Sequence, residues 1–238
     1  MFNQQLIVLI PTAASIAFLH TILGPDHYVP FIAMSRARKW STQKTMIVTL
    51  LAGIGHIIGS VLLGTVGIVF GIAIKRLEIF QSFQGNLAAW LLIIFGLIYF
   101  VWGLKRAIKN KPHKHFHLHP NGISHTHEHI HKDEHTHVHD EQGKQDITPW
   151  VLFTIFIFGP CEALIPIFMY TAINNSTFDL ITVTVVFGAI TILTMLTVVF
   201  ATSYGVNFIP ITRFEKYTHA ITGIIISFLG MGILFLGL

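Results

Sequence analysis

Charged side chains are scarce over most of this sequence. Asp, Glu, Lys and Arg make up 11% of the 238 residues, whereas hydrophobic residues make up 53%. Roughly a quarter of the residues of a soluble domain are charged, so this chain has too few charges to cover a surface that faces water. The composition excludes a soluble enzyme, a nucleic-acid-binding protein and a disordered protein, and it indicates an integral membrane protein.

The charges that do occur are concentrated in one segment. Seven of the 15 Lys and Arg, six of the 11 Asp and Glu and 11 of the 15 His lie between Lys105 and Asp146. The basic isoelectric point, near 9.3, is no sign of nucleic-acid binding, because the basic residues sit beside apolar segments as membrane topology requires.

Cysteine is almost absent as well, since Cys161 is the only one. A single thiol cannot form an internal disulfide, and a protein that passes a dithiol across a membrane needs at least two thiols. The sequence therefore argues against an internal thiol–disulfide relay. The N-terminal stretch lacks the basic segment of a secretory signal, so we expect it to remain as a first membrane span.

Six apolar stretches are long enough to cross a bilayer. They are 6–35, 45–74, 87–104, 147–173, 179–206 and 218–238. The first should break at Gly24-Pro25-Asp26-His27 and the fourth at Gly159-Pro160-Cys161-Glu162, because proline removes a backbone donor and disfavours helix at the residue before it. We predict an all-α polytopic membrane protein with six transmembrane helices, of which the first of each half is broken.

A shift of 135 residues superposes the two breaks. Each half would hold three spans, an odd number, so the halves would lie in the membrane with inverted topology. Inverted repeats with paired broken helices are typical of secondary transporters, whose substrate site lies at the breaks. We predict one three-helix repeat over 1–104, a hydrophilic insert over 105–146 and a second repeat over 147–238.

Basic residues are distributed unevenly between the two sides of the predicted bundle. One side carries Arg36, Arg38, Lys39, Lys44, Lys105, Arg106, Lys109, Lys111, Arg213 and Lys216, whereas Lys75 and Arg76 lie on the other. The positive-inside rule then places both termini outside and the insert in the cytoplasm. We expect the protein to lie in the inner or plasma membrane of a bacterium. The lipid bilayer is its expected partner, and the chain could form a homo-oligomer.

Two carboxylates, Asp26 and Glu162, lie within apolar spans at the two breaks. A charge at this depth costs roughly 3 kcal/mol or more unless it is paired or hydrated, so a functional role is favoured over a structural one. Cys161 precedes Glu162 directly, although a single membrane cysteine is more often a small packing residue. We predict that Cys161 and Glu162 contribute to a cation site, and Glu162 is also a candidate proton carrier.

Three histidines lie in the first two spans, His20 and His27 around the first break and His56 in the second span. The break would fold Asp26 and His27 back towards His20. Imidazole together with carboxylate suits Ni, Co, Zn or Fe(II) rather than Mg or Ca. The sequence predicts a metal site of His20, Asp26, His27 and His56; structural hydrogen bonds for the single histidines and a proton relay are the alternatives.

The insert contains histidines at alternate positions. They are His113, His115, His117, His119, His125, His127, His129, His131, His135, His137 and His139. Such a tract is typical of metal binding and should be disordered without a ligand. A pH-sensing linker or a solubilising spacer is the alternative.

These motifs resemble the nickel/cobalt transporter superfamily, above all its small six-span members: the H-type urease-accessory permeases and the nickel/cobalt efflux proteins with a His-rich loop. The resemblance is carried by Leu19-His20, Gly24-Pro25-Asp26-His27, Gly55-His56 and Gly159-Pro160-Cys161-Glu162-Ala163. The broken-helix layout is also similar to the thiol–disulfide electron carriers of cytochrome biogenesis, which the single cysteine would exclude, and to sulfite and organic-anion exporters.

The sequence and the resemblance together predict transport of a divalent transition-metal cation, Ni(II) or Co(II), without enzymatic activity or a prosthetic group; Zn is a further substrate candidate. Proton-coupled efflux is favoured, because a chelating cytoplasmic loop suits capture before export. Uptake of the urease-accessory type, a membrane-anchored metal buffer or sensor, and an anion exporter are the alternatives.

Overall fold

Long apolar helices make up the described chain outside the insert, in agreement with the predicted all-helical membrane class. The computed structural model describes residues 4–72, 74–109, 113–118, 124–129, 148–159, 161–206 and 216–236. The elements, in chain order, are α1 (Gln4–Leu23), η1 (Pro25–His27), α2 (Val29–Ala37), α3 (Thr42–Val69), α4 (Ile74–Lys109), β1 (His113–Leu118), β2 (Ser124–His129), α5 (Thr148–Phe158), α6 (Leu164–Asn174), α7 (Thr177–Val206) and α8 (Thr218–Leu236).

Within the described ranges, five helices are long and apolar enough to cross a membrane. They are Gln5–Leu23, Thr42–Val69, Ile79–Ile108, Thr177–Gly205 and Thr218–Leu236. The chain is therefore an integral multi-pass membrane protein. The predicted fourth span, 147–173, is divided at its predicted break into α5 and α6, each of 11 residues. A helix of that length measures about 16 Å, too short to cross about 30 Å of hydrocarbon alone.

Both predicted helix breaks are present. Helix α1 ends at Leu23, where the Gly24 N–H donates to the His20 carbonyl at 3.0 Å, and η1 and α2 follow. Helix α5 ends at Phe158 and α6 begins at Leu164. The sequence located these interruptions correctly because glycine and proline weaken a helix through local chemistry, whatever the helix packs against.

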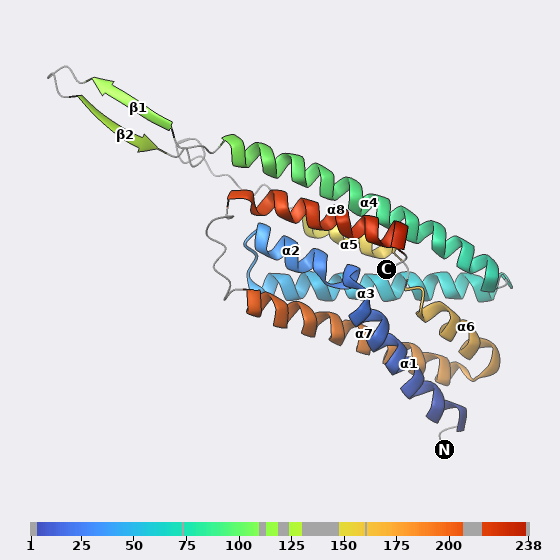
Figure 1. The fold of residues 1–238 in the computed structure, drawn as a ribbon. Coiled ribbons are helices and arrows are strands. Elements are labelled where there is room, and N and C mark those ends of the chain that lie inside the picture. The colour runs from blue at the N-terminus through green and yellow to red at the C-terminus, as the bar shows by residue number, and fades with distance from the viewer. Residues whose placement is uncertain are drawn as a thin grey trace, which may run out of the picture.

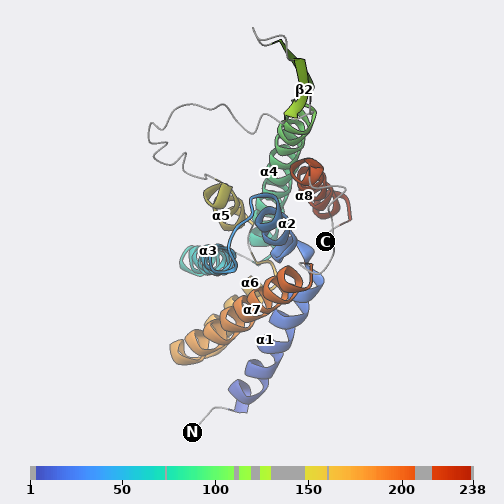
Figure 2. The same ribbon diagram turned by 90° about the vertical axis from the view of Figure 1, so that its left-hand side faces the viewer.

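The helices pack as a bundle with a shared apolar core. Helix α1 packs on α7, α4 packs on α8, and α3 contacts α5, α6 and α7 (Figure 1). In Figure 2, α4 and α8 lie on one side of the bundle and α1 and α7 on the other. The largest core cluster includes Phe31 of α2, Met195 of α7 and Phe156 of α5. Large apolar side chains such as Leu23, Val69 and Phe228 remain exposed on the outside, as a bilayer environment requires.

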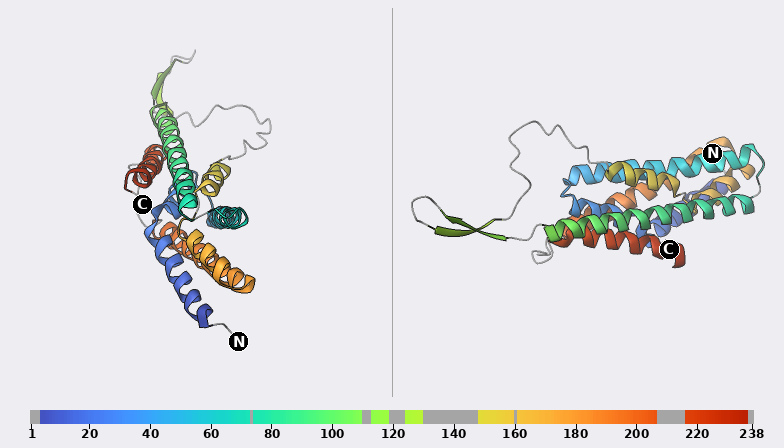
Figure 3. Two further views of the ribbon diagram at one scale, coloured as in Figure 1. Left: turned by 90° about the vertical axis from the view of Figure 1, so that its right-hand side faces the viewer. Right: turned by 90° about the horizontal axis from the view of Figure 1, so that it is seen from above.

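Helix α4 is longer than the predicted third span. The prediction was 87–104, whereas the helix runs from Ile74 to Lys109, which is 36 residues or about 54 Å. It therefore extends past the predicted start of the insert at residue 105. The β-strands lie beyond its C-terminal end, outside the helical bundle (Figure 3).

The described part of the insert forms an antiparallel hairpin, which corrects the expectation of disorder for these residues. In its register His113 is opposite His129, His115 opposite His127 and His117 opposite His125. Side chains of a β-strand alternate between its two faces with a period of two. The histidines of the insert alternate with the same period, so the sequence contained the signal for a strand. The predicted ligands His119, His131, His135, His137 and His139 lie outside the described residues.

Close packing of α4 on α8 yields a test of the fold. A Cβ at Gly230 would lie 2.7 Å from the Ala89 carbonyl oxygen and 2.8 Å from Ile93 Cγ1, whereas a Cβ at Gly205 would meet nothing within 4 Å. We expect Gly230→Ala to destabilise the protein by about 1–3 kcal/mol, the usual effect of overpacking. Gly205→Ala is the control and should leave the melting temperature in detergent unchanged or raise it. Equal melting temperatures of the two variants would contradict the tight α4–α8 contact.

Candidate metal centre

The first helix break brings two histidines together. His20 lies in the last turn of α1, and His27 ends the short helix η1 that follows Gly24. In an unbroken helix these residues would be about 10 Å apart along the axis. The break turns the chain back, so the centroids of the two rings are 4.9 Å apart, with an interplanar angle of 82°.

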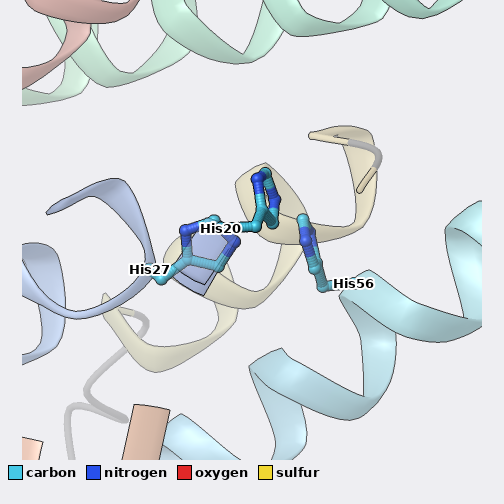
Figure 4. Close-up of side chains that lie close together, drawn as sticks. All are labelled: His20, His27 and His56. Atoms are coloured by element: carbon cyan, nitrogen blue, oxygen red, sulfur yellow. The ribbon is translucent and has the colours of Figure 1, made fainter. Parts of the chain in front are cut away.

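A third imidazole comes from a different helix. His56 lies in the middle of α3, and its ring centroid is 5.2 Å from that of His27, again edge to face at 87°. Figure 4 shows the three rings converging on one space. One nitrogen from each of His20, His27 and His56 lies within 4.8 Å of the others. Residues far apart in the sequence therefore form one group of nitrogen donors.

Asp26 orients His27. Nδ1 of His27 donates to Asp26 Oδ1 and to the Gly24 carbonyl oxygen, both at 3.1 Å. Because both neighbours are acceptors, Nδ1 carries the hydrogen, and in the neutral ring Nε2 then keeps its lone pair. A carboxylate that holds the far nitrogen of a histidine is the usual outer support of a metal ligand. Asp26, predicted as a ligand, thus lies where it would support one.

Many hydroxyl groups of the membrane helices are satisfied by backbone carbonyl oxygens, whereas three imidazole nitrogens of the cluster are not. The Thr21 hydroxyl donates to the Ala17 carbonyl oxygen at 2.7 Å, and the Ser60 hydroxyl donates to that of His56 at 2.9 Å. In contrast, His27 Nε2 and both ring nitrogens of His56 are buried without a hydrogen-bond partner among the described residues. Leaving a buried polar atom unsatisfied costs about 1–3 kcal/mol, so these nitrogens call for a ligand.

Apolar rings close one side of the histidine cluster. The ring centroid of Phe156 lies 6.2 Å from that of His56 and 4.7 Å from that of Phe31. His27 and His56 are themselves almost fully buried, with 2% and 5% of their surfaces exposed. The Asp26 side chain is partly open to the surroundings of the protein, with 31% of its surface exposed. The surroundings have a low dielectric, in which a charge is strongly stabilised by nearby neutral donors and a carboxylate.

Among the described residues, the second break adds no side-chain donor to this group. Cys161 is fully buried in an apolar cluster with residues such as Leu6, Ala17 and Phe187, as expected for a packing residue. The Glu162 side chain is exposed, and a Cβ at Gly85 of α4 would lie 3.4 Å from its Oε1. Among the described residues, the donors that lie together are the three histidines; the predicted contributions of Cys161 and Glu162 to a metal site stay predictions.

Sequence reasoning missed the residue that links the second break to the cluster. The Cys161 N–H donates to Ser60 Oγ at 2.6 Å, and Ser60 lies one helical turn after His56 on α3. Residues four apart share a face of a helix, so the spacing of His56 and Ser60 was the available signal. Through Ser60, the second break holds the helix that carries His56.

Comparison with protein families identifies the chain. The family model described as "Cytochrome C biogenesis protein transmembrane region" matches residues 29–233, which is most of the sequence, and the chain belongs to that family. Comparison with curated proteins gave no match, and comparison with solved structures gave none either.

Family membership corrects two predictions. Assignment to the nickel/cobalt transporter superfamily was wrong, and the function predicted with it, proton-coupled transport of Ni(II) or Co(II), is overturned as well. The proton-carrying role of Glu162 stays a prediction. The motifs behind the assignment were short glycine, proline and histidine patterns, and a broken-helix layout is common to several families. The single cysteine limits thiol chemistry, but it does not exclude a fold family.

Tight packing around Gly24 yields a test of the histidine cluster. A Cβ there would lie 2.7 Å from His27 Nδ1 and 2.8 Å from Asp26 Oδ1, whereas a Cβ at Gly159 would meet Ala88 Cβ at an ordinary 3.6 Å. We expect Gly24→Ala to separate Asp26 from His27 and to weaken Zn(II) binding at the cluster about 10- to 100-fold, the usual effect of losing an outer partner. Gly159→Ala, at the matching break, is the control. Equal Zn(II) affinities in a chelator competition would contradict the role assigned to Gly24.

Proposed function

We propose that this member of the cytochrome c biogenesis transmembrane family binds a transition-metal cation inside its membrane domain, through His20, His27 and His56. The observation that carries the proposal is the convergence of three imidazoles within 4.8 Å, with buried nitrogens that lack other partners. A histidine in a transmembrane segment is rare and usually functional, and three together are best explained by a common ligand.

The geometry supports a small cation. Nitrogen ligands bind zinc at about 2.0–2.1 Å, which in a tetrahedral site places them roughly 3.3 Å from one another. The three nitrogens lie within 4.8 Å, so modest rotations of the rings would close the set. Three protein ligands leave a fourth position for water or another ligand. Asp26, bonded to His27, would offset part of the positive charge.

The donor chemistry selects a class of metal. Neutral imidazoles suit Zn, Cu, Ni, Co and Fe(II), whereas Mg and Ca require oxygen ligands. Of the donors within 4.8 Å of one another, none is a thiolate or a carboxylate. The proposal therefore concerns a late first-row transition metal bound mainly by nitrogen, and it assigns binding to the site without a catalytic step.

Thiol chemistry is a weaker basis for the function of this chain. A disulfide requires two thiols at a Cα separation below about 7 Å, and Cys161 is the only cysteine. Its side chain is fully buried, which also opposes exchange with the thiol of a partner protein. We infer that the imidazole cluster, and not a cysteine pair, carries the chemistry of this family member.

Zn(II) binding to the purified protein tests the proposal. In a background in which the 11 insert histidines are replaced by serine, we expect His56→Gln to lower the Zn(II) affinity at least tenfold, because one ligand is lost. X-ray absorption at the zinc edge should show about three imidazole ligands in the unmodified cluster.

Two control variants sharpen this experiment. His219→Gln removes a membrane histidine outside the cluster, and Cys161→Ala removes the only thiol. Both should bind Zn(II) as before. Zinc–sulfur scattering, or an affinity that His56→Gln leaves unchanged, would overturn the proposal.

We propose that the hairpin of the insert forms a second metal site, outside the bundle. Residues directly opposite in an antiparallel pair have Cβ atoms about 4.5–5.5 Å apart, close enough for two imidazoles to share a cation. The register places the histidine positions of β1 opposite those of β2, on one face of the ribbon. The opposed positions Lys114 and Glu128, on the other face, favour the same register through opposite charge.

Paired substitutions distinguish a metal site formed by opposed histidines of the hairpin from metal binding that depends only on the number of histidines. In a His56→Gln background, we expect His115→Ser with His127→Ser to lower the Zn(II) affinity of the insert at least fivefold, since an opposed pair is lost. His135→Ser with His137→Ser removes the same number of imidazoles outside the hairpin and is the control. Equal losses in isothermal titration calorimetry would contradict the hairpin site.

The inverted repeat remains a proposal, and the packing supports it. Under the proposed correspondence, α1 and α2 match α5 and α6, while α3 and α4 match α7 and α8. Helix α1 packs on α7 as α5 packs on α3, and α2 contacts α7 as α6 contacts α3. These exchanged contacts are what a two-fold axis between the halves would produce.

We also propose that the hairpin lies on the cytoplasmic side of a bacterial inner membrane. The C-terminal ends of α2 and α4 lie at the end of the bundle that leads to the hairpin (Figure 1). Arg36, Arg38, Lys39, Lys105 and Arg106 lie there, whereas Arg76 lies at the start of α4. Basic residues beside the ends of membrane helices favour the cytoplasmic side.

A further inference from the structure

Aromatic rings form a cluster at the end of the bundle that leads to the hairpin. Tyr99 and Trp102 belong to α4, and His219 lies in the first turn of α8. The Tyr99 hydroxyl and His219 Nδ1 share a hydrogen bond of 2.8 Å. The ring centroid of Trp102 lies 5.0 Å from that of His219 and 5.4 Å from that of Tyr99. The three rings form a common platform across two helices.

Two guanidinium groups rest on this platform. Cζ of Arg38, which follows α2, lies 5.4 Å from the ring centroid of Tyr99 and 5.3 Å from that of Trp102. Cζ of Arg106 lies 5.5 Å from the centroid of Trp102 as well. Arg38, Arg106 and Lys39 all act electrostatically on His219. Positive charges from α4 and from the end of α2 are thus gathered at one place.

Within the described ranges, no ion pair joins a carboxylate to Arg38 or Arg106. Nε of Arg38 is moreover buried without a hydrogen-bond partner among the described residues. Like charges held together repel one another, and the faces of aromatic rings compensate for this only in part. Among the described residues, the guanidinium groups of Arg38 and Arg106 therefore have no anion paired with them.

We propose that Arg38 and Arg106 bind the phosphate of an anionic phospholipid headgroup. Guanidinium groups match phosphate oxygens in pairs, which makes arginine well suited to this ligand. Tyrosine and tryptophan are enriched at the level of lipid headgroups. This platform lies near the C-terminal end of the membrane helix α4, at the corresponding depth. Trp102 is 40% exposed, so the platform is accessible from outside.

The adjoining helix surface would accommodate the acyl chains. One turn or less from Trp102 on α4, Ile98 and Val101 are 65% and 47% exposed, and on α8 Ile221 and Ile225 are also exposed. A free phosphate ion would leave this apolar surface uncovered, whereas a phospholipid covers it and supplies the anion. The lipid would connect α2, α4 and α8 on the side where anionic lipids are abundant, if that side is the cytoplasmic one.

Thermal stability and lipid retention of the full-length protein test this inference. We expect phosphatidylglycerol to raise the melting temperature in detergent by several degrees, and phosphatidylcholine with the same acyl chains to raise it less. Arg38→Gln with Arg106→Gln should lower the amount of phosphatidylglycerol retained in native mass spectrometry at least fivefold. Arg106→Gln alone changes an exposed side chain and keeps the test valid if the double variant fails to fold.

The control is Arg76→Gln, an exposed arginine near the other end of α4. It should retain phosphatidylglycerol as the unmodified protein does. Inorganic phosphate is tested in parallel, and equal stabilisation by phosphate alone would overturn the lipid as the ligand. Equal retention of the two lipids, or unchanged retention in Arg106→Gln and the double variant, would overturn the anion site itself.

Discussion

Backbone groups freed by a broken helix inside a membrane must find partners within the protein, and this constraint shapes the centre of the molecule. At the first break, the Gly24 N–H donates to the His20 carbonyl oxygen. The Gly24 carbonyl oxygen accepts from both the backbone N–H and Nδ1 of His27. At the second break, the Cys161 N–H donates to Ser60 Oγ. The same bonds that satisfy the backbone therefore also hold the histidines.

The histidine cluster depends on this double attachment. His27 is oriented through Gly24 and Asp26, and His56 lies on a helix that Ser60 ties to the other break. Each half of the chain thus helps to place the three rings, although all three rings come from the first half. In a low dielectric, donors that are largely held in place in advance bind a cation with little reorganisation, here modest rotations of the rings.

Family membership and site chemistry point to different aspects of the protein. Membership shows common descent of a membrane domain, matched over residues 29–233. The chemistry available within that domain is set by individual side chains, and here these are three imidazoles and one buried thiol. A fold can carry different chemistry in different members, so the proposed metal site and the family assignment are compatible.

Helical class, five of the six predicted spans and both breaks followed from the sequence alone, because apolar length and the Gly-Pro pairs act locally. The sequence also singled out His20, His27 and His56 as polar groups in apolar helices. It did not identify the family, since a few short motifs recur in several membrane folds, and it overlooked the hairpin although the histidines alternate with the period of a strand.

Tertiary structure alone decided which of the singled-out residues meet. Asp26 bonds to His27 instead of adding to the donor group, and Cys161 packs among apolar side chains instead of joining the imidazoles. Both outcomes depend on how each helix end is rotated and on contacts between residues more than 100 positions apart, such as Cys161 and Ser60. Sequence determines where a helix must stop, whereas the packing of distant helices determines what its freed end faces.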